Sequence, residues 1–304
     1  MMDWLLIIIL AYLFFSFGSF CDKLVLSGAT QRAPRPKSYT FYVGVFGLFI
    51  VLLIPFIKFG FPNNTGLFWI ILDAFIRILG IYTMFVALER FDVSRVMATI
   101  GATQPMFIFI LTWIFWGPQP IAATYVLAFV LLLIGSVIIS INKNVEVTGN
   151  YLKITIFSSL MFSLDYIFSK FVYLNQPFPQ GLVWINIFMF LFVLFFLVQK
   201  NSRKEIFAKQ MILNKRTQIA FLCAQGFGGV ANFLQSFAIS LAPVAFLAII
   251  NSLRGIQYAF LFLATLFTSF FFPRILKEEL LKKIVIQKTI SIIIIAIGLA
   301  LLIK

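Results

Sequence analysis

The sequence predicts an all-α membrane protein with ten transmembrane helices arranged as two inverted five-helix repeats. Composition is the first reason, because hydrophobic residues make up 62% of the 304 positions and charged residues only 11%, whereas a soluble domain needs about a quarter of charged residues. The second is that apolar stretches, each long enough to cross the roughly 30 Å hydrocarbon core as a helix, alternate with short polar breaks. The third is that segments of the first half recur in the second half.

The breaks between the apolar stretches carry residues that are typical of turns. The segments RAPRPKS, FPNNTG, WGPQP and NQPFPQG combine Pro, Gly and Asn, which end helices and form turns. In chain order, the predicted spans are 4–26, 38–57, 67–88, 93–116, 121–141, 151–173, 181–198, 217–241, 244–271 and 284–303.

The positions of Lys and Arg predict how the helices are oriented in an inner (cytoplasmic) membrane. Basic residues in short loops stay on the cytoplasmic side, and here they follow the odd-numbered spans. We therefore expect five cytoplasmic loops and both termini outside. The residues concerned are Arg32, Arg35, Lys37, Arg90, Arg95, Lys143 and those within 200–216 and 274–283.

An internal repeat is indicated by the segments FSFGSFCDKLV and FSLDYIFSKFV. The first begins at Phe15 and the second at Phe162, and at this one offset Lys23 also aligns with Lys170. The predicted repeats are residues 1–145 and 146–304. Because each would contain an odd number of spans, the two halves would be inverted across the membrane, an arrangement that favours alternating access to a site near the midplane.

Several functional classes are disfavoured by composition. The net charge of +14 comes from basic residues placed between apolar runs, which indicates topology signals and contact with anionic lipid headgroups rather than nucleic-acid binding. The chain has no His, which excludes a His-ligated metal, a His proton relay and a Ser-His-Asp triad. No phosphate-binding Gly loop is present. We expect no cofactor and no enzymatic activity, and transport that is passive or driven by a gradient or by exchange.

Charged residues inside the predicted spans are candidates for function, because each must find a partner or line a wet cavity. Asp73 and Arg77 lie four positions apart on one helix face, and an intrahelical ion pair is the simplest interpretation. Asp165 and Arg254 lie deep in two other spans. They either pair with each other across the bundle or meet a zwitterionic substrate.

Polar residues at helical spacing extend the candidate site. Gln225, Asn232 and Gln235 share one stripe of a span and serve either as interhelical hydrogen-bond partners or as substrate ligands. Gln104 precedes Pro105, whose missing amide leaves a backbone carbonyl free. The predicted substrate-binding set is Tyr82, Gln104, Asp165, Gln225, Asn232, Gln235, Asn251, Arg254, Gln257 and Tyr258.

Two further segments have a predicted structural role. The pair Ala224 and Gly228 has the small-xxx-small spacing that allows helices to approach closely. The longest polar break, KNSRKEIFAKQMILNKR, mixes apolar residues with cations and predicts a short amphipathic helix on the cytoplasmic leaflet, with a regulatory partner site as the bolder alternative.

The layout of three segments resembles the EamA-like branch of the drug/metabolite transporter superfamily over nearly the whole chain. These segments are FFSFGSFCDKLVLSG, ALERFDVSRVMATIGATQPMFIFILTWIFW, and SFAISLAPVAFLAIINSLRGIQYAFLFLATLF followed by KEEL. The resemblance implies two inverted five-helix repeats around a central cavity, and relatives that export amino acids or exchange sugar phosphates and nucleotide sugars.

The chain departs from the pattern of this superfamily at two points. Many members place both termini in the cytoplasm, whereas the loop charges here predict the reverse. Small multidrug relatives carry a membrane-embedded Glu in the first span that couples proton to cation transport, and Phe15 and Phe162 stand at the corresponding places here. Proton-coupled export of lipophilic cations by that route is therefore not expected.

The expected function is that of a secondary transporter, an exporter or exchanger that moves a small polar or amphipathic metabolite such as an amino acid by alternating access. The alternative is a non-transporting or lipid-handling membrane scaffold protein. The expected partners are a small-molecule substrate and membrane lipids, and the chain is expected to act as a monomer or homodimer.

Overall fold

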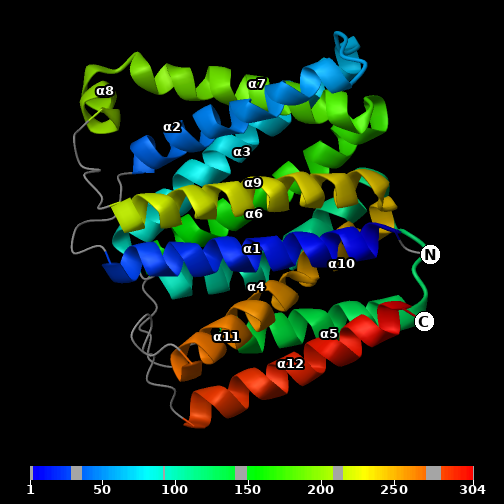
Figure 1. Ribbon diagram of the computed structural model, residues 1–304. Coiled ribbons are helices and arrows are strands. Elements are labelled where there is room, and N and C mark those ends of the chain that lie inside the picture. The colour runs from blue at the N-terminus through cyan, green and yellow to red at the C-terminus, as the bar shows by residue number, and fades with distance from the viewer. Residues whose placement is uncertain are drawn as a thin grey trace. The chain divides into compact units, whose positions relative to one another are not determined.

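The computed structural model describes residues 3–28, 36–91, 93–140, 149–207, 215–271 and 282–303. Every regular element in these residues is a helix (Figure 1). Eight helical segments are long and apolar enough to cross a membrane, which confirms an all-α membrane protein. The elements are α1 (Asp3–Gly28), α2 (Pro36–Gly47), η1 (Leu48–Phe56), α3 (Asn64–Arg90), α4 (Val93–Trp116), α5 (Ala123–Ser140), α6 (Gly149–Asn175), α7 (Phe178–Leu194), η2 (Phe195–Leu197), α8 (Lys200–Ile206), α9 (Lys215–Leu241), η3 (Val244–Phe246), α10 (Leu247–Ser252), α11 (Arg254–Phe271) and α12 (Lys282–Ile303).

Two of the ten predicted spans coincide with helices whose length or composition is less typical of a membrane span. The apolar part of α5, Ala123–Ile139, is shorter than the other candidates. Helix α9 is long enough, at 27 residues, but it begins with Lys215 and Arg216 and carries several amides, so its composition is more polar. Eight spans are therefore established by length and composition, and the count of ten remains a prediction.

The chain divides into two compact units, and each unit takes helices from both halves of the sequence. Unit 1 consists of Met1–Arg32, Gln119–Ile141 and Met211–Lys304, and unit 2 consists of Ala33–Pro118 and Asn142–Gln210. The two compact units are therefore not separated at residue 145, the predicted boundary between the repeats. The relation of residues 1–145 to residues 146–304 as repeats remains a prediction.

Unit 2 is built around the contact between α3 and α6. Helix α6 also packs against α4, and α7 packs against α2 and α3. Ile70, Ala74 and Ile78 recur every four residues on α3 and belong to one buried cluster, because residues at this spacing share a helix face. The same cluster includes Ile185 and Met189 of α7.

The start of α3 is fixed by side chains of the break that precedes it. Asn63 is the N-cap residue, and its Oδ1 accepts hydrogen bonds from the Gly66 amide at 2.7 Å and from Gln176 Nε2 at 3.0 Å. The Gly60 carbonyl accepts from Gln180 Nε2 and Trp184 Nε1, each at 2.9 Å. These bonds tie residues 60–66 to Gln176, which directly follows α6, and to α7.

In unit 1, α1 packs along α9, and α5 packs along α12 (Figure 1). A Cβ atom added at Gly18 of α1 would lie 3.4 Å from the Ala224 carbonyl oxygen and 3.6 Å from the Gly228 amide nitrogen. The backbone of α1 therefore approaches the Ala224–Gly228 turn of α9 directly, as the small-xxx-small spacing predicted.

The longest polar break contains α8, which confirms a short helix there. Lys37 of α2 donates to Gln199 Oε1 at 3.2 Å and to Ser202 Oγ at 3.0 Å, and the Ile206 side chain is buried. Helix α8 therefore rests on α2. Residues 208–214, the remainder of the predicted amphipathic segment before α9, lie outside the described part of the chain.

Candidate functional site: an ionic network between α3 and α6

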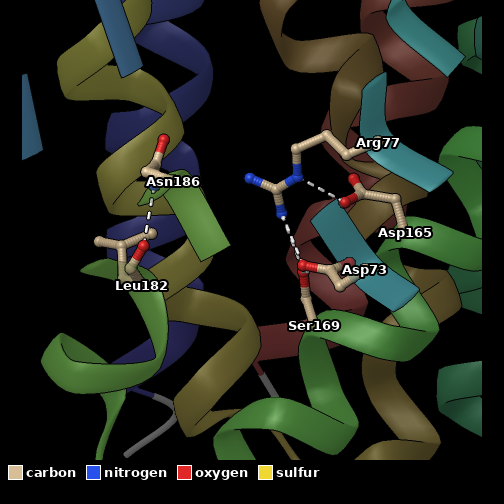
Figure 2. A network of polar contacts seen from close by, with 6 residues as sticks. All are labelled: Asp73, Arg77, Asp165, Ser169, Leu182 and Asn186. Carbon is tan, nitrogen blue, oxygen red and sulfur yellow. Dashed lines mark hydrogen bonds and ion pairs between the residues drawn. The ribbon is translucent and has the colours of Figure 1, made fainter. Parts of the chain in front are cut away.

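Two membrane-spanning helices of unit 2 carry charged side chains at the place where they pack together. On α3, Asp73 and Arg77 lie one helical turn apart, and on α6, Asp165 and Ser169 have the same spacing. Residues four apart share one face of a helix. The contact between α3 and α6 therefore brings both pairs together (Figure 2).

Arg77 connects the two helices through its guanidinium group. Its Nε donates to Asp165 Oδ1 at 2.6 Å, and its Nη2 donates to Ser169 Oγ at 2.9 Å. The same Nη2 lies 3.5 Å from Asp73 Oδ2, at the limit of a hydrogen bond. Ser169 lies 3.3 and 3.2 Å from the two carboxylate oxygens of Asp73, and its hydroxyl donates to that carboxylate.

The network is almost sealed by surrounding protein. The side chain of Asp73 is 0% exposed, that of Arg77 is 8% exposed and that of Asp165 is 14% exposed. Isolated charges in such surroundings are strongly unfavourable, and ion pairs with supporting hydrogen bonds make their burial tolerable. Asp165 is the member of the network that is most open to its surroundings.

The structure extends one sequence prediction and revises another. The intrahelical pair of Asp73 and Arg77 exists, but it is the longer of the two ion pairs that Arg77 forms. For Asp165 the sequence left Arg254 or a substrate as partners, whereas its ion pair in the structure is with Arg77. Asp73, Arg77 and Ser169 were absent from the predicted substrate-binding set. The spacing of Ser169 four residues after Asp165 was the available signal.

A seam of hydroxyl groups continues along α6. Ser158 Oγ donates to the Gly80 carbonyl of α3 at 3.1 Å, and Thr103 Oγ1 of α4 lies 2.7 Å from Ser159 Oγ. Ser163 Oγ is 3.2 Å from the backbone carbonyl of Gln104. These short side chains satisfy polar groups while keeping the helices close, which is how polar residues commonly join helices in membranes.

Asn186 of α7, also drawn in Figure 2, contacts its own helix. Its Nδ2 donates to the Leu182 carbonyl at 2.9 Å. The side chain therefore belongs to α7 packing rather than to the ionic network.

In unit 1, the predicted span 244–271 is matched by a candidate membrane span, Val244–Thr268, and the helix of this span is interrupted. It consists of η3, α10 and α11, with Leu253 between the last two. The Ile256 amide donates to the Leu253 carbonyl at 2.9 Å, a tighter pairing than that of an α-helix. The Ser252 carbonyl accepts instead from Ser136 Oγ of α5 at 3.0 Å.

A second backbone carbonyl at this break, that of Ile250, also accepts a hydrogen bond from a side chain. Tyr12 Oη of α1 donates to the Ile250 carbonyl at 2.9 Å, in a buried position. Side chains of α1 and α5 thus satisfy carbonyls at the interruption, as is necessary for irregular backbone at membrane depth.

Four predicted binding residues lie on this interrupted segment. Asn251 is completely buried, and neither polar atom of its amide has a hydrogen-bond partner among the described residues. Arg254 is the first residue of α11 and is half-buried, and Tyr258 follows it by one turn. Gln257 Nε2 lies 3.2 Å from Ser19 Oγ of α1.

The remaining predicted residues are distributed over both units. On α9, Gln225 is half-buried, Asn232 is exposed and Gln235 is buried, so the predicted stripe is not equally enclosed along its length. In unit 2, Gln104 is buried, and the Tyr82 ring lies 5.9 Å from the Phe196 ring.

No combination of side chains in the described part of the chain resembles a metal centre. These residues contain no group of three or more His, Cys, Asp or Glu side chains that could hold a metal ion.

Comparison with known proteins supports the fold and gives no function. No model of a known family matches the chain, and no curated protein matches it. Twenty-eight chains of solved structures do match. One, described only as "Crystal structure of protein", has a TM-score of 0.67 and 14% sequence identity, covering 98% of this chain and 96% of its own. At that identity the similarity establishes a shared fold alone.

Proposed function

We propose that the chain is a secondary transporter that moves a small polar or amphipathic metabolite, such as an amino acid, by alternating access. The observation that carries this proposal is the ionic network of Asp73, Arg77 and Asp165 inside two apolar, membrane-spanning helices. Charged side chains are costly to insert into a membrane, and those that are retained typically mark a path for solutes, ions or protons. A helix bundle that served only as a scaffold would gain little from such a network.

The proposed architecture is that of the drug/metabolite transporter superfamily, EamA-like branch, with ten spans in two inverted repeats. The packing of the helices supports it. Helix α6 packs against α3 and α4 in unit 2, and α1 packs against α9 and α11 in unit 1. In the numbering of the predicted spans, span 6 contacts spans 3 and 4, and span 1 contacts spans 8 and 9. Each span of one set thus differs by five from its counterpart in the other set. Helix α1 begins and α12 ends at the same end of unit 1 (Figure 1), as an even number of spans requires.

The proposed substrate-binding region includes the interruption between α10 and α11. The amino end of a helix carries a partial positive charge, and Arg254 adds a full positive charge at the first residue of α11. An anionic group such as a carboxylate is the ligand that suits this combination, and discontinuous helices are used in this way by other transporters. The buried amide of Asn251 offers one donor and one acceptor beside it.

The orientation proposed for the inner membrane follows from the basic loops. Lys200, Arg203 and Lys204 lie in or beside α8, between the seventh and eighth predicted spans. Positive residues in such loops remain in the cytoplasm, so both termini are outside. The transporter acts as a monomer or homodimer, without a cofactor and without enzymatic activity.

Flux into proteoliposomes tests the proposed function. The purified full-length protein is reconstituted, and uptake of a radiolabelled mixture of amino acids is measured against protein-free liposomes. Saturable uptake that is competed by the unlabelled mixture is expected. Absence of saturable uptake of amino acids and of other small polar metabolites, by protein that is folded and correctly inserted, would contradict the proposal.

A lipid-handling function is the second candidate, and one feature of unit 1 favours it. An apolar cavity of about 670 Å³ is lined by α1 and α11, with Leu13, Phe17, Phe260, Leu263 and Phe267 among its walls. Its polar residue Ser16 donates to the Leu13 carbonyl at 2.7 Å, so the lining suits an acyl chain. Transbilayer movement of labelled lipid in the same vesicles, without saturable solute uptake, would favour this alternative.

A further inference from the structure

The ionic network contains more negative than positive groups. Arg77 is its one guanidinium, and it faces the carboxyl groups of both Asp73 and Asp165. If both carboxyl groups are ionised, one negative charge remains without a counter-charge in surroundings that are nearly closed. Two carboxyl groups that share one site in this way resist simultaneous ionisation.

The described parts of the neighbouring helices supply no further cation. Helix α7 and residues 96–116 of α4 carry no ionisable side chain. On α2, Lys37 bonds to Gln199 and Ser202 at the α8 end of the unit, and Tyr42 donates to the Ile206 carbonyl. None of these residues faces the network.

The cations of α3 and α6 themselves also lie elsewhere. Lys170 follows Ser169 directly, and adjacent residues point to different sides of a helix. Lys153 and Arg90 lie about 18–20 Å along their helices from the network, at 1.5 Å per residue. Tyr173 lies one helical turn after Ser169 on α6, and a phenol carries no charge near neutral pH.

The uncompensated charge falls on Asp73. Its carboxyl group is the most deeply buried of the network, at 0% exposure, and Arg77 is 3.5 Å away, compared with 2.6 Å for the ion pair with Asp165. Its shorter contact is with Ser169, a neutral hydroxyl. A carboxylate has about four acceptor positions, and these two contacts satisfy it poorly as an anion.

We propose that this network is a proton-binding site, that the proton resides on Asp73 in the conformation described here, and that its exchange is coupled to substrate movement. The coupling rests on the proposed transport function, whereas the binding does not. In the binding step a hydronium ion transfers its proton to the Asp73 carboxylate, which yields a neutral carboxylic acid and a water molecule. The remaining pair of Arg77 and Asp165 is then electrically neutral.

Release of the proton provides a switch between two pairings of Arg77. Protonated Asp73 leaves the guanidinium bonded to Asp165 across the contact between α3 and α6. Ionised Asp73 competes for the same guanidinium within α3, and so weakens the bond between the helices. Proton binding thereby biases helix packing, which is the requirement for a two-state coupling element. Asp165, the most exposed member, marks the side from which protons enter.

A proton suits this site better than a metal cation does. Sodium and divalent ions require several oxygen ligands, whereas the oxygens of Asp73 are already approached by Ser169 and Arg77. The described residues also hold no third carboxylate nearby. A site with two carboxyl groups, one hydroxyl and a permanent guanidinium is therefore suited to protonation.

Infrared spectroscopy tests the proton site directly on the purified full-length protein. A carbonyl stretching band of a protonated carboxyl group is expected at neutral pH, and it should be lost in Asp73→Asn. The matched control is Glu89→Gln at the exposed end of the same helix, which should retain the band. In the wild-type protein alone, the band should decrease as pH is raised, so the test does not depend on folding of the variant.

The contrary outcomes are equally distinct. Absence of the band in the wild-type protein, or its loss in Asp165→Asn with retention in Asp73→Asn, would overturn the assignment. Stabilisation of the wild-type protein by sodium chloride but not by choline chloride, abolished in Asp73→Asn, would replace the proton with a metal cation.

The coupling is tested separately with the radiolabelled amino-acid mixture. A pH gradient across proteoliposomes is expected to change the accumulated label in the wild type and in Glu89→Gln, and to have no effect in Asp73→Asn. A gradient response that is intact in Asp73→Asn would overturn the coupling. If no protein transports label, the proposed function fails while the infrared result still decides whether Asp73 holds a proton.

Discussion

Arg77 bonds simultaneously to side chains of two helices, which makes it the residue on which the ionic network depends. Its Nε contacts Asp165 at 2.6 Å and its Nη2 contacts Asp73 at 3.5 Å. Removing one member of a buried ion cluster costs more than the pair was worth, because the other charges remain without compensation. The three charged residues should therefore differ in how much stability the protein loses when each is neutralised.

Arg77→Gln is expected to be the most damaging single change in the network. It leaves two neighbouring carboxyl groups buried without a cation, at a cost of about 3–5 kcal/mol. Asp165→Asn should cost less, because Asp73 remains as a partner for the guanidinium. Adding Asp165→Asn to Arg77→Gln should recover part of the loss, since the coupled residues do not act independently.

Thermal unfolding of the purified variants measures this order. Arg90→Gln, an exposed position at the end of α3, is the control and should leave the midpoint unchanged. Equal losses for Arg77→Gln and Asp165→Asn, with strictly additive behaviour in the double variant, would show that the network has no energetic coupling.

Arg254 lies where a cation is least favoured by its own helix. It is the first residue of α11, and the amino end of a helix is disfavoured for positive charge by about 0.3–1 kcal/mol. A bound anion would offset this cost, so Arg254→Gln should abolish saturable uptake of the amino-acid mixture. Arg254→Lys, which retains the charge, should retain part of the uptake. Full uptake by Arg254→Gln would rule out a role in anion binding.

At the scale of residues, the sequence predicted which side chains are unusual and the pair of Asp73 and Arg77 within one helix, but not the ion pair between two helices. Asp73, Arg77 and Asp165 stand out because they are ionisable residues inside apolar runs. The pairing of Arg77 with Asp165 depends on α3 packing against α6. The two residues are 88 positions apart in the sequence. No local pattern contains that information, and so Arg254 was considered as the partner of Asp165.

At the scale of elements, the interruption at Leu253 is maintained by contacts from other helices. Ser136 of α5 and Tyr12 of α1 donate to the Ser252 and Ile250 carbonyls. The sequence predicted a single span over 244–271, and the polar residues of the segment NSLRGIQ around Leu253 were interpreted as substrate ligands rather than as a break in the helix. Hydropathy located the ends of the helices well, because it reports burial in lipid, but it carries no information on hydrogen bonds between helices.

Gly255 permits the close approach of α5 and α12 to this interruption. A Cβ atom there would lie 2.3 Å from Ser136 Oγ and 2.9 Å from Ile295 Cδ1. Gly255→Ala should therefore destabilise the protein, by about 1–3 kcal/mol as for other overpacked cores. Combined with Ser136→Ala, which removes the nearest atom, the loss should be smaller than the sum of the two single losses.

A glycine in open space is the control for this experiment. A Cβ atom added at Gly226 of α9 meets nothing within 4 Å, and Gly→Ala inside a helix is favourable by up to about 1 kcal/mol. Gly226→Ala should leave the unfolding midpoint unchanged or raise it. A larger loss for Gly226→Ala than for Gly255→Ala would contradict the packing described for unit 1.

At the scale of the whole molecule, each compact unit combines helices from both halves of the sequence. Unit 2 contains α3 and α6, and unit 1 contains α1 and α9, which are the pairs expected when two inverted repeats interlock. Sequence similarity between residues 15–25 and 162–172 predicted such repeats from few matches. It could not predict how the helices divide into units, because that division depends on contacts between distant segments.

The orientation of the chain in the membrane gives the last prediction. Basic residues around α8 predict a cytoplasmic position for that break, and the Asn63–Asn64 break, which lies one span away from a basic loop, should face outside. Cys21 and Cys223 carry thiols that are not in a disulfide, and both are first replaced by Ser. Single Cys residues are then introduced at Asn201 and Asn64, both exposed, since Ser202 is buried against α2. In intact cells an impermeant thiol reagent should label Asn64→Cys and spare Asn201→Cys, and permeabilised cells should label both. The opposite pattern would invert the topology, and would place the termini in the cytoplasm as in many members of the superfamily that the sequence resembles.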